Sequence, residues 1–361
     1  KLDADPYILG TPDGLIDLRT GEKREAARED FITRLCRVSP GGDCPRWDAY
    51  LVDVTGGDQG FAEYLRRVAG YLLTGVVTEH AAFFLYGPSA SGKSTFTETL
   101  LWIMGDCAMS APIELLTPHG NEHPTLLAGL ASVRAVVISE TEEGKAIAES
   151  RFKGLVAGDT ISARFMRADY FTFTPQCKLI LHGNHRPRLR NTDESMRRRL
   201  HVIPFTQVIP EGNRDKNLKS VLQAEGPGIM RWALQGAKLW LEGGLAPPPA
   251  VSCAGEAYFE AEDIIGRWLE ECCALGEGFS ASRAQLWASW QRWTEKIGEG
   301  ARNNRWLNEH LRTRGLSEGS NHGTRLFRGI GLYPENWSTS DEKLNTKPSE
   351  GPRESPDQEM F

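Results

Sequence analysis

The feature that most constrains the fold is a loop at residues 87–94 with the sequence GPSASGKS. It fits the pattern G-x-x-x-x-G-K-[ST] at every fixed position. The apolar run at residues 81–86 predicts a buried strand before the loop, and residues 95–104 predict a helix after it, which Gly105 ends. In such a strand–loop–helix unit, backbone N–H groups and the helix N-terminus favour a bound anion.

We therefore expect residues 87–94, hereafter the phosphate loop, to bind the phosphates of a nucleotide. Lys93 is expected to reach the β- and γ-phosphates and Ser94 to hold Mg²⁺, while the glycines give the backbone close access. The residues predicted to bind ATP are Gly87, Pro88, Ser89, Ala90, Ser91, Gly92, Lys93, Ser94 and Thr95.

Length and composition narrow the class of protein. A chain of 361 residues predicts two or three domains. The net charge of −6 requires any nucleic-acid surface to be local. Seven cysteines without a C-x-x-C pair indicate a reducing compartment and no zinc site. With no signal peptide or membrane-spanning apolar run, we expect a cytoplasmic location, in a bacterial host or virus-infected cell. Because the chain starts at Lys1 in mid-pattern, we interpret it as a piece of a longer protein.

Two further apolar runs predict strands of a parallel sheet with flanking helices. The run at residues 133–138 leads into Ser139 and Glu140, and a carboxylate there can lie near Mg²⁺ and orient the attacking water. Glu140 is the first candidate and Glu142 the second; the alternative is a solvated acidic loop. The run at residues 178–182 is followed by Asn184, which could sense the γ-phosphate or belong to an ordinary turn.

Alternating apolar residues at 160–174 predict a β-hairpin with a turn at residues 167–169. Lys153, Arg164 and Arg167 lie in or beside it. These cations are candidates for contacting the backbone of a single-stranded nucleic acid. The alternative is a structural hairpin whose charged face is simply solvated.

A second basic cluster ends at Arg197, Arg198 and Arg199, directly before the apolar run at residues 200–205. In a ring-forming nucleotidase, such an arginine can reach the γ-phosphate of the neighbouring subunit. A salt-bridged surface cluster is the alternative, and it is the preferred interpretation for Arg186, Arg188 and Arg190.

The chain divides into four predicted regions. Residues 1–78 form a mainly helical N-terminal lobe after a short β start, and residues 79–246 form the α/β core. The three prolines at 247–249 mark a boundary. Residues 250–337 predict a winged-helix-like domain of three helices and a hairpin, and residues 338–361 predict a disordered tail. The basic residues of the third region are Arg302, Arg305, Arg312, Arg314, Arg325 and Arg328, and its tryptophans are expected in its core.

Taken together, these motifs resemble the superfamily 3 helicases of poxvirus and satellite-phage type, as found in the C-terminal part of phage and plasmid primase-helicases. The resemblance covers roughly residues 3–332. It rests on the order and spacing of DGLIDLRTGE (13–22), GYLLTG (70–75), GPSASGKST (87–95), VVISETEEG (136–144), FKGLVAGDTISARF (152–165), KLILHGNHRP (178–187), RRRLHVIPF (197–205) and GIMRWALQGAKLWLEGGL (228–245).

The resemblance implies an AAA+-like, hexameric ring ATPase that uses ATP and Mg²⁺ and moves along DNA with 3′-to-5′ polarity. It assigns Ser94 and Glu140 to the binding of Mg²⁺, and Asn184 to the sensing of the γ-phosphate. It assigns Arg198 or Arg199 as the arginine finger, the side chain that reaches the γ-phosphate of the neighbouring subunit. The region of Lys153, Arg164 and Arg167 corresponds to the hairpin of the central channel. It also implies an upstream primase or primase-polymerase module. The chain departs from the family pattern at Ser139, where many relatives have Asp, and at Arg197, where an aromatic residue is expected.

The function expected from the sequence is therefore an ATP-dependent DNA helicase in phage or plasmid replication, acting on single-stranded or forked DNA as a homo-oligomer. Two alternatives remain. One is a small-molecule kinase, against which the basic hairpin argues. The other is a DNA-binding replication initiator in which ATP only sets assembly.

Overall fold

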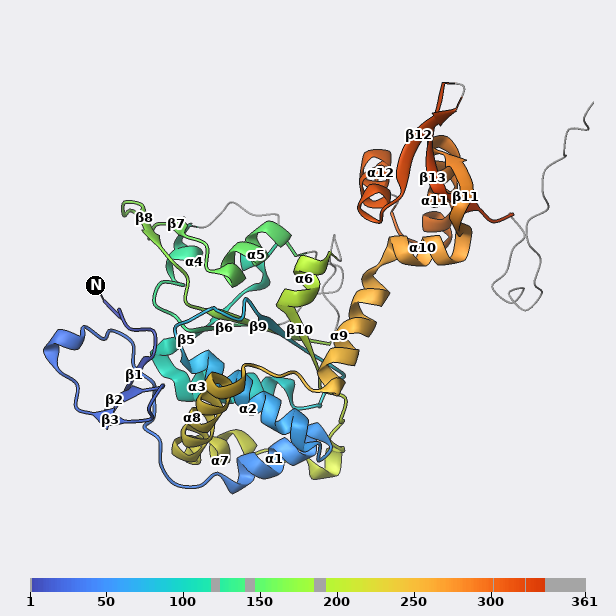
Figure 1. The fold of residues 1–361 in the computed structure, drawn as a ribbon. Coiled ribbons are helices and arrows are strands. Elements are labelled where there is room, and N and C mark those ends of the chain that lie inside the picture. Colours follow the sequence, from blue (N-terminus) through green and yellow to red (C-terminus); the bar gives the residue numbers. More distant parts are fainter. Residues whose placement is uncertain are drawn as a thin grey trace, which may run out of the picture. The chain divides into compact units, whose positions relative to one another are not determined.

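The computed structural model describes residues 2–117, 124–139, 147–184, 193–300, 302–321 and 323–334. It divides the chain into two units, Lys1–Glu262 and Asp263–Phe361, each described here by itself (Figure 1). In the described residues no helix combines the length and hydrophobicity needed to cross a membrane. The predicted tail at residues 338–361 lies outside the described residues.

A five-stranded parallel sheet forms the core of the first unit (Figure 1). Its strand order is β10-β4-β9-β6-β5, and all four neighbouring pairs are parallel. The strands are β4 (Ala82–Tyr86), β5 (Ala108–Ala111), β6 (Ala135–Ser139), β9 (Lys178–Gly183) and β10 (Leu200–Pro204). Four of them confirm the apolar runs predicted as strands, whereas β5, with the sequence AMSA, was not predicted.

Helices cover both faces of this sheet because successive strand residues point to opposite sides (Figure 1). In β4, Phe83 and Leu85 belong to one hydrophobic cluster, and Ala82 and Phe84 belong to the other. The first cluster contains residues of α1 (Pro45–Thr55), α2 (Gln59–Leu73), α3 (Lys93–Met104), α7 (Leu218–Ala224) and α8 (Gly226–Gly243). The second contains residues of α5 (Glu149–Ala157), α6 (Glu194–Arg199) and α9 (Pro249–Glu262), and Leu126 and Leu127 of α4 (Pro124–Ala128) pack against it.

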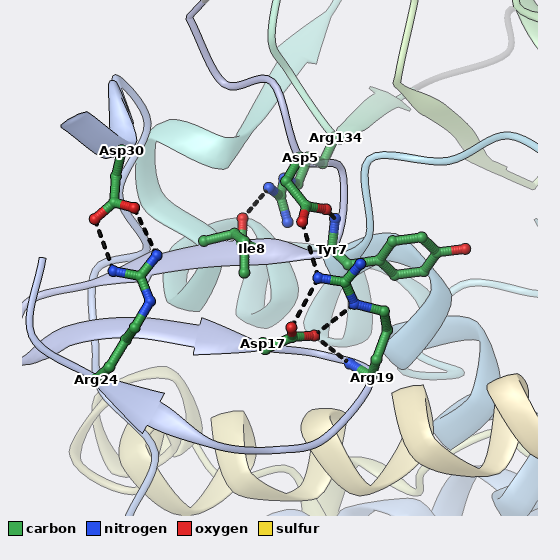
Figure 2. Close-up of polar contacts among 8 residues, drawn as sticks. All are labelled: Asp5, Tyr7, Ile8, Asp17, Arg19, Arg24, Asp30 and Arg134. Atoms are coloured by element: carbon green, nitrogen blue, oxygen red, sulfur yellow. Dashed lines mark hydrogen bonds and ion pairs between the residues drawn. The ribbon is translucent and has the colours of Figure 1, made fainter. Parts of the chain in front are cut away.

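The N-terminal lobe packs into the same unit as the core. Strands β1 (Ile8–Thr11), β2 (Gly14–Asp17) and β3 (Lys23–Arg24) form a small antiparallel sheet, with Pro12 and Asp13 joining β1 to β2. In Figure 2, Arg19 bridges Asp5 and Asp17 at 2.8 and 2.7 Å. The buried guanidinium of Arg134, just before β6, donates to the carbonyl of Ile8 and fastens this sheet to the core.

The boundary between the units falls later than predicted, after Glu262 rather than at the prolines. The reason is α9, which begins at Pro249 and packs on β10, with Tyr258 and Phe259 buried in the second cluster. The predicted start of the C-terminal domain at residue 250 is therefore corrected to residue 263.

The described residues of the second unit form three helices and a three-stranded antiparallel sheet of order β11-β13-β12. Its elements are α10 (Ile264–Cys272), β11 (Cys273–Ser282), α11 (Arg283–Lys296), α12 (Asn304–Thr313), β12 (Ser317–Asn321) and β13 (Thr324–Leu332). Trp268, Trp290 and Trp293 lie in its core, as expected. Helices α9 and α10 are separate, and Cys273–Leu275 pair with β13.

Candidate nucleotide-binding site

A cavity of about 750 Å³ lies at the carboxyl ends of the central strands. The ends of β4, β6 and β9 lie side by side, since Tyr86 pairs with Gly183 and Ser139 with His182. Ligands of parallel α/β sheets bind at this edge. The lining residues are Ser89, Ala90, Ser91, Gly92, Lys93, Ser94, Thr95, Thr97, Glu98, Leu101, Ser110, Val137, Ser139, His182, Gly183 and Asn184.

The phosphate loop connects β4 to α3 in the predicted order, and two positions in it require glycine. A Cβ on Gly87 would lie 1.9 Å from the carbonyl oxygen of Phe205. Gly92 has φ +91°, and a Cβ there would lie 2.6 Å from Cγ1 of Val54. The loop therefore keeps its close backbone approach only with glycine at both positions.

The ammonium group of Lys93 closes the loop on itself. Its Nζ donates to the carbonyl oxygens of Gly87 and Pro88, both at 2.7 Å, and to Oγ of Ser91 at 3.2 Å. The side chain is only 6% exposed, and its burial lowers the lysine pKa. No carboxylate of the described residues pairs with it, and a bound phosphate group would give it an anionic partner.

Of the predicted catalytic residues, Asn184 reaches the phosphate loop directly. Its Nδ2 donates to Oγ of Ser89 at 3.1 Å. This contact joins the end of β9 to the loop after β4, where an amide could sense a phosphate. Glu140 and Glu142 lie outside the described residues; the chain is described up to Ser139, which lines the cavity.

The residues present fit a nucleotide with its magnesium ion. Lys93 and the first turn of α3 provide the positive end of the site, and the exposed Ser94 brings a hydroxyl group to the cavity wall. Within the described ranges no cluster of three or more His, Cys, Asp or Glu side chains could hold a metal by itself. Ser94 would thus hold the ion together with phosphate oxygens and the acidic residue expected after β6.

Among the residues of this site that sequence reasoning missed are Tyr50 and His182. The buried Tyr50 of α1 donates its hydroxyl group to the carbonyl oxygen of Gly92 at 2.9 Å and so supports the loop. No sequence signal marks it, because it lies on the apolar stripe of its helix. His182 lines the cavity near the end of β9, and a polar residue at the end of an apolar run could have pointed to it.

The predicted arginine-finger residues end α6 and are not among the residues that line this cavity. Arg199 donates from Nη1 to the carbonyl oxygen and to Oγ of Ser195, at 3.0 and 2.6 Å. Arg197 lies over the ring of Phe259, 5.2 Å from its centroid. Arg198 is exposed and has no hydrogen-bond or ion-pair partner among the described residues. Arg186, Arg188 and Arg190 lie outside the described residues.

The predicted hairpin is confirmed as β7 (Ile161–Ala163) paired with β8 (Phe171–Phe173). Arg164 and Arg167 lie in the loop that joins the two strands. Lys153 belongs instead to α5, where its Nζ forms an ion pair with Asp193 at 2.8 Å. Asp193 also caps α6, since its side chain accepts from the N–H of Met196. The structure therefore places Lys153 between two helices rather than in the hairpin loop.

Comparison with known proteins gives two family matches. Residues 1–56 match the family described as D5 N terminal like, and residues 85–199 match a family of unknown function, DUF5906. The chain is 29% identical over 229 residues to the candidate helicase L207/L206 of Acanthamoeba polyphaga mimivirus, covering 61% of this chain and 24% of the relative. It is 23% identical over 259 residues to the candidate helicase 022R of Frog virus 3, covering 66% and 26%.

The fold is similar to the apo structure of the NrS-1 C-terminal region. The TM-score is 0.55 at 12% identity, with 82% of this chain and 78% of the other covered. These matches fit the resemblance to phage and viral superfamily 3 helicases drawn from the motifs. The chain spans about a quarter of the length of the two viral relatives.

Proposed function

We propose that this chain is the motor part of an ATP-dependent DNA helicase that acts as a ring in phage, plasmid or viral replication. The phosphate loop would bind ATP, and Ser94 with Glu140 would hold Mg²⁺ and orient the attacking water. The relatives named as candidate helicases support a helicase-related role. The 3′-to-5′ polarity and the hexamer are carried over from the resemblance.

The observation that supports the proposal most directly is that the cavity and the arginines of α6 lie at opposite edges of the sheet. No arginine is found among the described residues that line the cavity. Strand β10 runs parallel to β4, with Leu200 beside Ala82 and Pro204 beside Tyr86. Since α6 ends directly before Leu200, its arginines lie at the amino edge of the sheet, and the phosphate loop lies at the carboxyl edge. Four strand residues span roughly 13 Å, more than an arginine side chain.

In the proposed ring, such an arginine would instead reach the cavity of a neighbouring subunit. Such a residue stabilises the charge that develops on the transferred phosphoryl group. Of the two candidates, Arg198 is the better finger, because Arg199 is engaged with Ser195 inside its own helix.

The DNA-binding surfaces in this proposal are the hairpin loop and the second unit. Arg164 and Arg167 would contact DNA phosphates from the hairpin. The second unit would bind as a winged helix, with Arg305 on the exposed side of α12. Two other arginines of that unit have internal partners, since Arg312 pairs with Glu318 at 2.7 Å and Arg314 pairs with Asp263.

The second candidate function is a DNA-binding replication initiator in which ATP controls assembly only. The separate three-helix unit favours it, because a module of this kind can bind DNA without a motor. A motor and an initiator differ in turnover, since only a motor needs hydrolysis coupled to movement on DNA.

The test is ATP hydrolysis with and without single-stranded DNA, together with the native mass of the particle in ATP and Mg²⁺. We expect DNA-stimulated turnover in a sixfold particle, and no turnover for Lys93→Ala. Turnover by Lys93→Ala at the wild-type rate would refute the nucleotide site. A DNA-bound assembly whose slow hydrolysis DNA leaves unchanged would favour the initiator.

A further inference from the structure

Three large apolar side chains are exposed on the loop between β7 and β8. Met166 is 79% exposed, Tyr170 60% and Phe165 50%. Within the described residues, Met166 is the most exposed large apolar side chain. Single exposed apolar residues are ordinary on protein surfaces, but three within six residues form a patch that requires an explanation. We name residues 164–170 the tip loop.

The tip loop is held in place rather than loosely attached. The ring of Phe165 stacks on that of Phe171 in β8, with centroids 5.8 Å apart and planes at 21°. The guanidinium of Arg164 lies 4.8 Å from the centroid of Tyr170. At the base of the hairpin, Ala163 is fully buried, and Ile161 and Phe173 pack against the second hydrophobic cluster. The exposed rings are therefore presented on a fixed support.

Cations and aromatic rings alternate along the tip loop. It contains Arg164 and Arg167 against one acidic residue, Asp169. Arg167 has φ +60°, in the left-handed region, which marks the turn of the loop. Proteins that bind single strands without sequence preference combine cations for the backbone with aromatic faces on which bases stack. Arginine stacked on tyrosine keeps its charge while its plane extends the aromatic surface.

We propose that the tip loop binds single-stranded DNA through its bases as well as its phosphates. Tyr170 and Phe165 are the stacking surfaces, Met166 packs against a base or sugar, and the two arginines meet phosphates. This inference rests on the proposed function and adds a base-contacting site to it. The excess of positive charge on the loop favours a nucleic acid over an apolar protein partner as the occupant.

The experiment compares oligothymidylate with an abasic strand of the same length, which keeps the phosphates and lacks the bases. Binding to the full chain is measured with ATP and Mg²⁺ at fixed ionic strength. Because stacking contributes strongly per base, we expect the wild type to bind the abasic strand at least tenfold more weakly. Tyr170→Ala should lose most of this difference, and Tyr170→Phe should keep it. Phe31→Ala is the matched control, since Phe31 is an aromatic residue 55% exposed outside the loop.

Equal wild-type affinity for the two strands would overturn the inference. The proposed function would still stand in that case if oligothymidylate stimulates ATP hydrolysis. The inference would also be overturned if Tyr170→Ala still bound oligothymidylate more tightly than the abasic strand by the wild-type factor. A third contrary result is a changed native mass of Tyr170→Ala with unchanged DNA binding. The last result would show that the loop joins copies of the chain. Absence of both DNA binding and DNA stimulation in the wild type would overturn the proposed function itself.

Discussion

Replacing Arg198 by alanine should remove ATP hydrolysis while leaving the fold and ATP binding intact. The side chain is exposed at the end of α6, and it has no partner in the described part of the chain. The matched variant is Arg199→Ala, one residue further on. Arg199 donates two hydrogen bonds to Ser195 and so stabilises the helix that presents Arg198.

The two variants should differ in both activity and stability. An arginine finger contributes about 10³–10⁵ in kcat, which is about 4–7 kcal/mol of transition-state stabilisation. Arg198→Ala should lose most of this factor and change the free energy of unfolding by no more than about 0.5 kcal/mol. Arg199→Ala should lose about 1–3 kcal/mol of unfolding free energy, because each of its hydrogen bonds contributes about 0.5–1.5 kcal/mol.

The assay mixes Arg198→Ala with Lys93→Ala and measures turnover in the mixed assemblies. Each variant alone should be inactive. In a mixture, an intact Lys93 site can face an intact Arg198 of the neighbour, so activity should partly return. No recovery, although both proteins assemble, would refute an arginine supplied by a second copy. Wild-type turnover by Arg198→Ala would refute the choice of this residue.

Three other predictions follow from single contacts. Gly87→Ala places a Cβ 1.9 Å from the carbonyl oxygen of Phe205, so it should cost about 1–3 kcal/mol of unfolding free energy and abolish nucleotide-dependent thermal stabilisation; unchanged stabilisation would contradict this. Lys153→Met and Asp193→Asn should each lower the free energy of unfolding by about 0.2–1 kcal/mol, and the two losses should not add in a double-mutant cycle. Both variants should have the same effect on DNA affinity. Weaker DNA binding by Lys153→Met alone would show that Lys153 contacts DNA. Burial lowers the pKa of His201 from 6.5 to about 4, so the folded state binds this proton less readily than the unfolded chain; urea unfolding should show stability falling from pH 6.5 to pH 4, and less steeply in His201→Phe.

The core could be predicted from the sequence because its signals are local. Strand β4, the phosphate loop and α3 follow one another without interruption, so their spatial relation is fixed by the chain. Asn184 could be predicted for a related reason: parallel strands bring their carboxyl ends to one edge of the sheet. Asn184 and Ser89 are far apart in sequence, and this rule alone predicts that they lie close together.

Other features depend on long-range packing that leaves no local pattern. Lys178 was read as the first residue of an apolar strand, yet it is fully buried, and burial holds its pKa well below the usual range. It donates to the carbonyl oxygen of Gln176, two residues before it, and to that of Thr74, which only the folded N-terminal lobe brings there. Strand β11 was missed because Gly276 and Gly278 interrupt its pattern, and its pairing with β13 is visible only in the fold.

The position of α6 separates the two functions that remain open. A single chain holds the phosphate loop and Asn184 on one edge of its sheet and the α6 arginines on the other. If ATP only controlled assembly, ATP binding alone would be enough for that function. An exposed arginine at the amino edge of the sheet would then have no need to contact a phosphate group of ATP. Each subunit of a motor must instead hydrolyse ATP in step with its neighbour. An arginine of one subunit that enters the nucleotide-binding cavity of the next provides this coupling. The exposed Arg198 beside a tethered Arg199 therefore favours the motor.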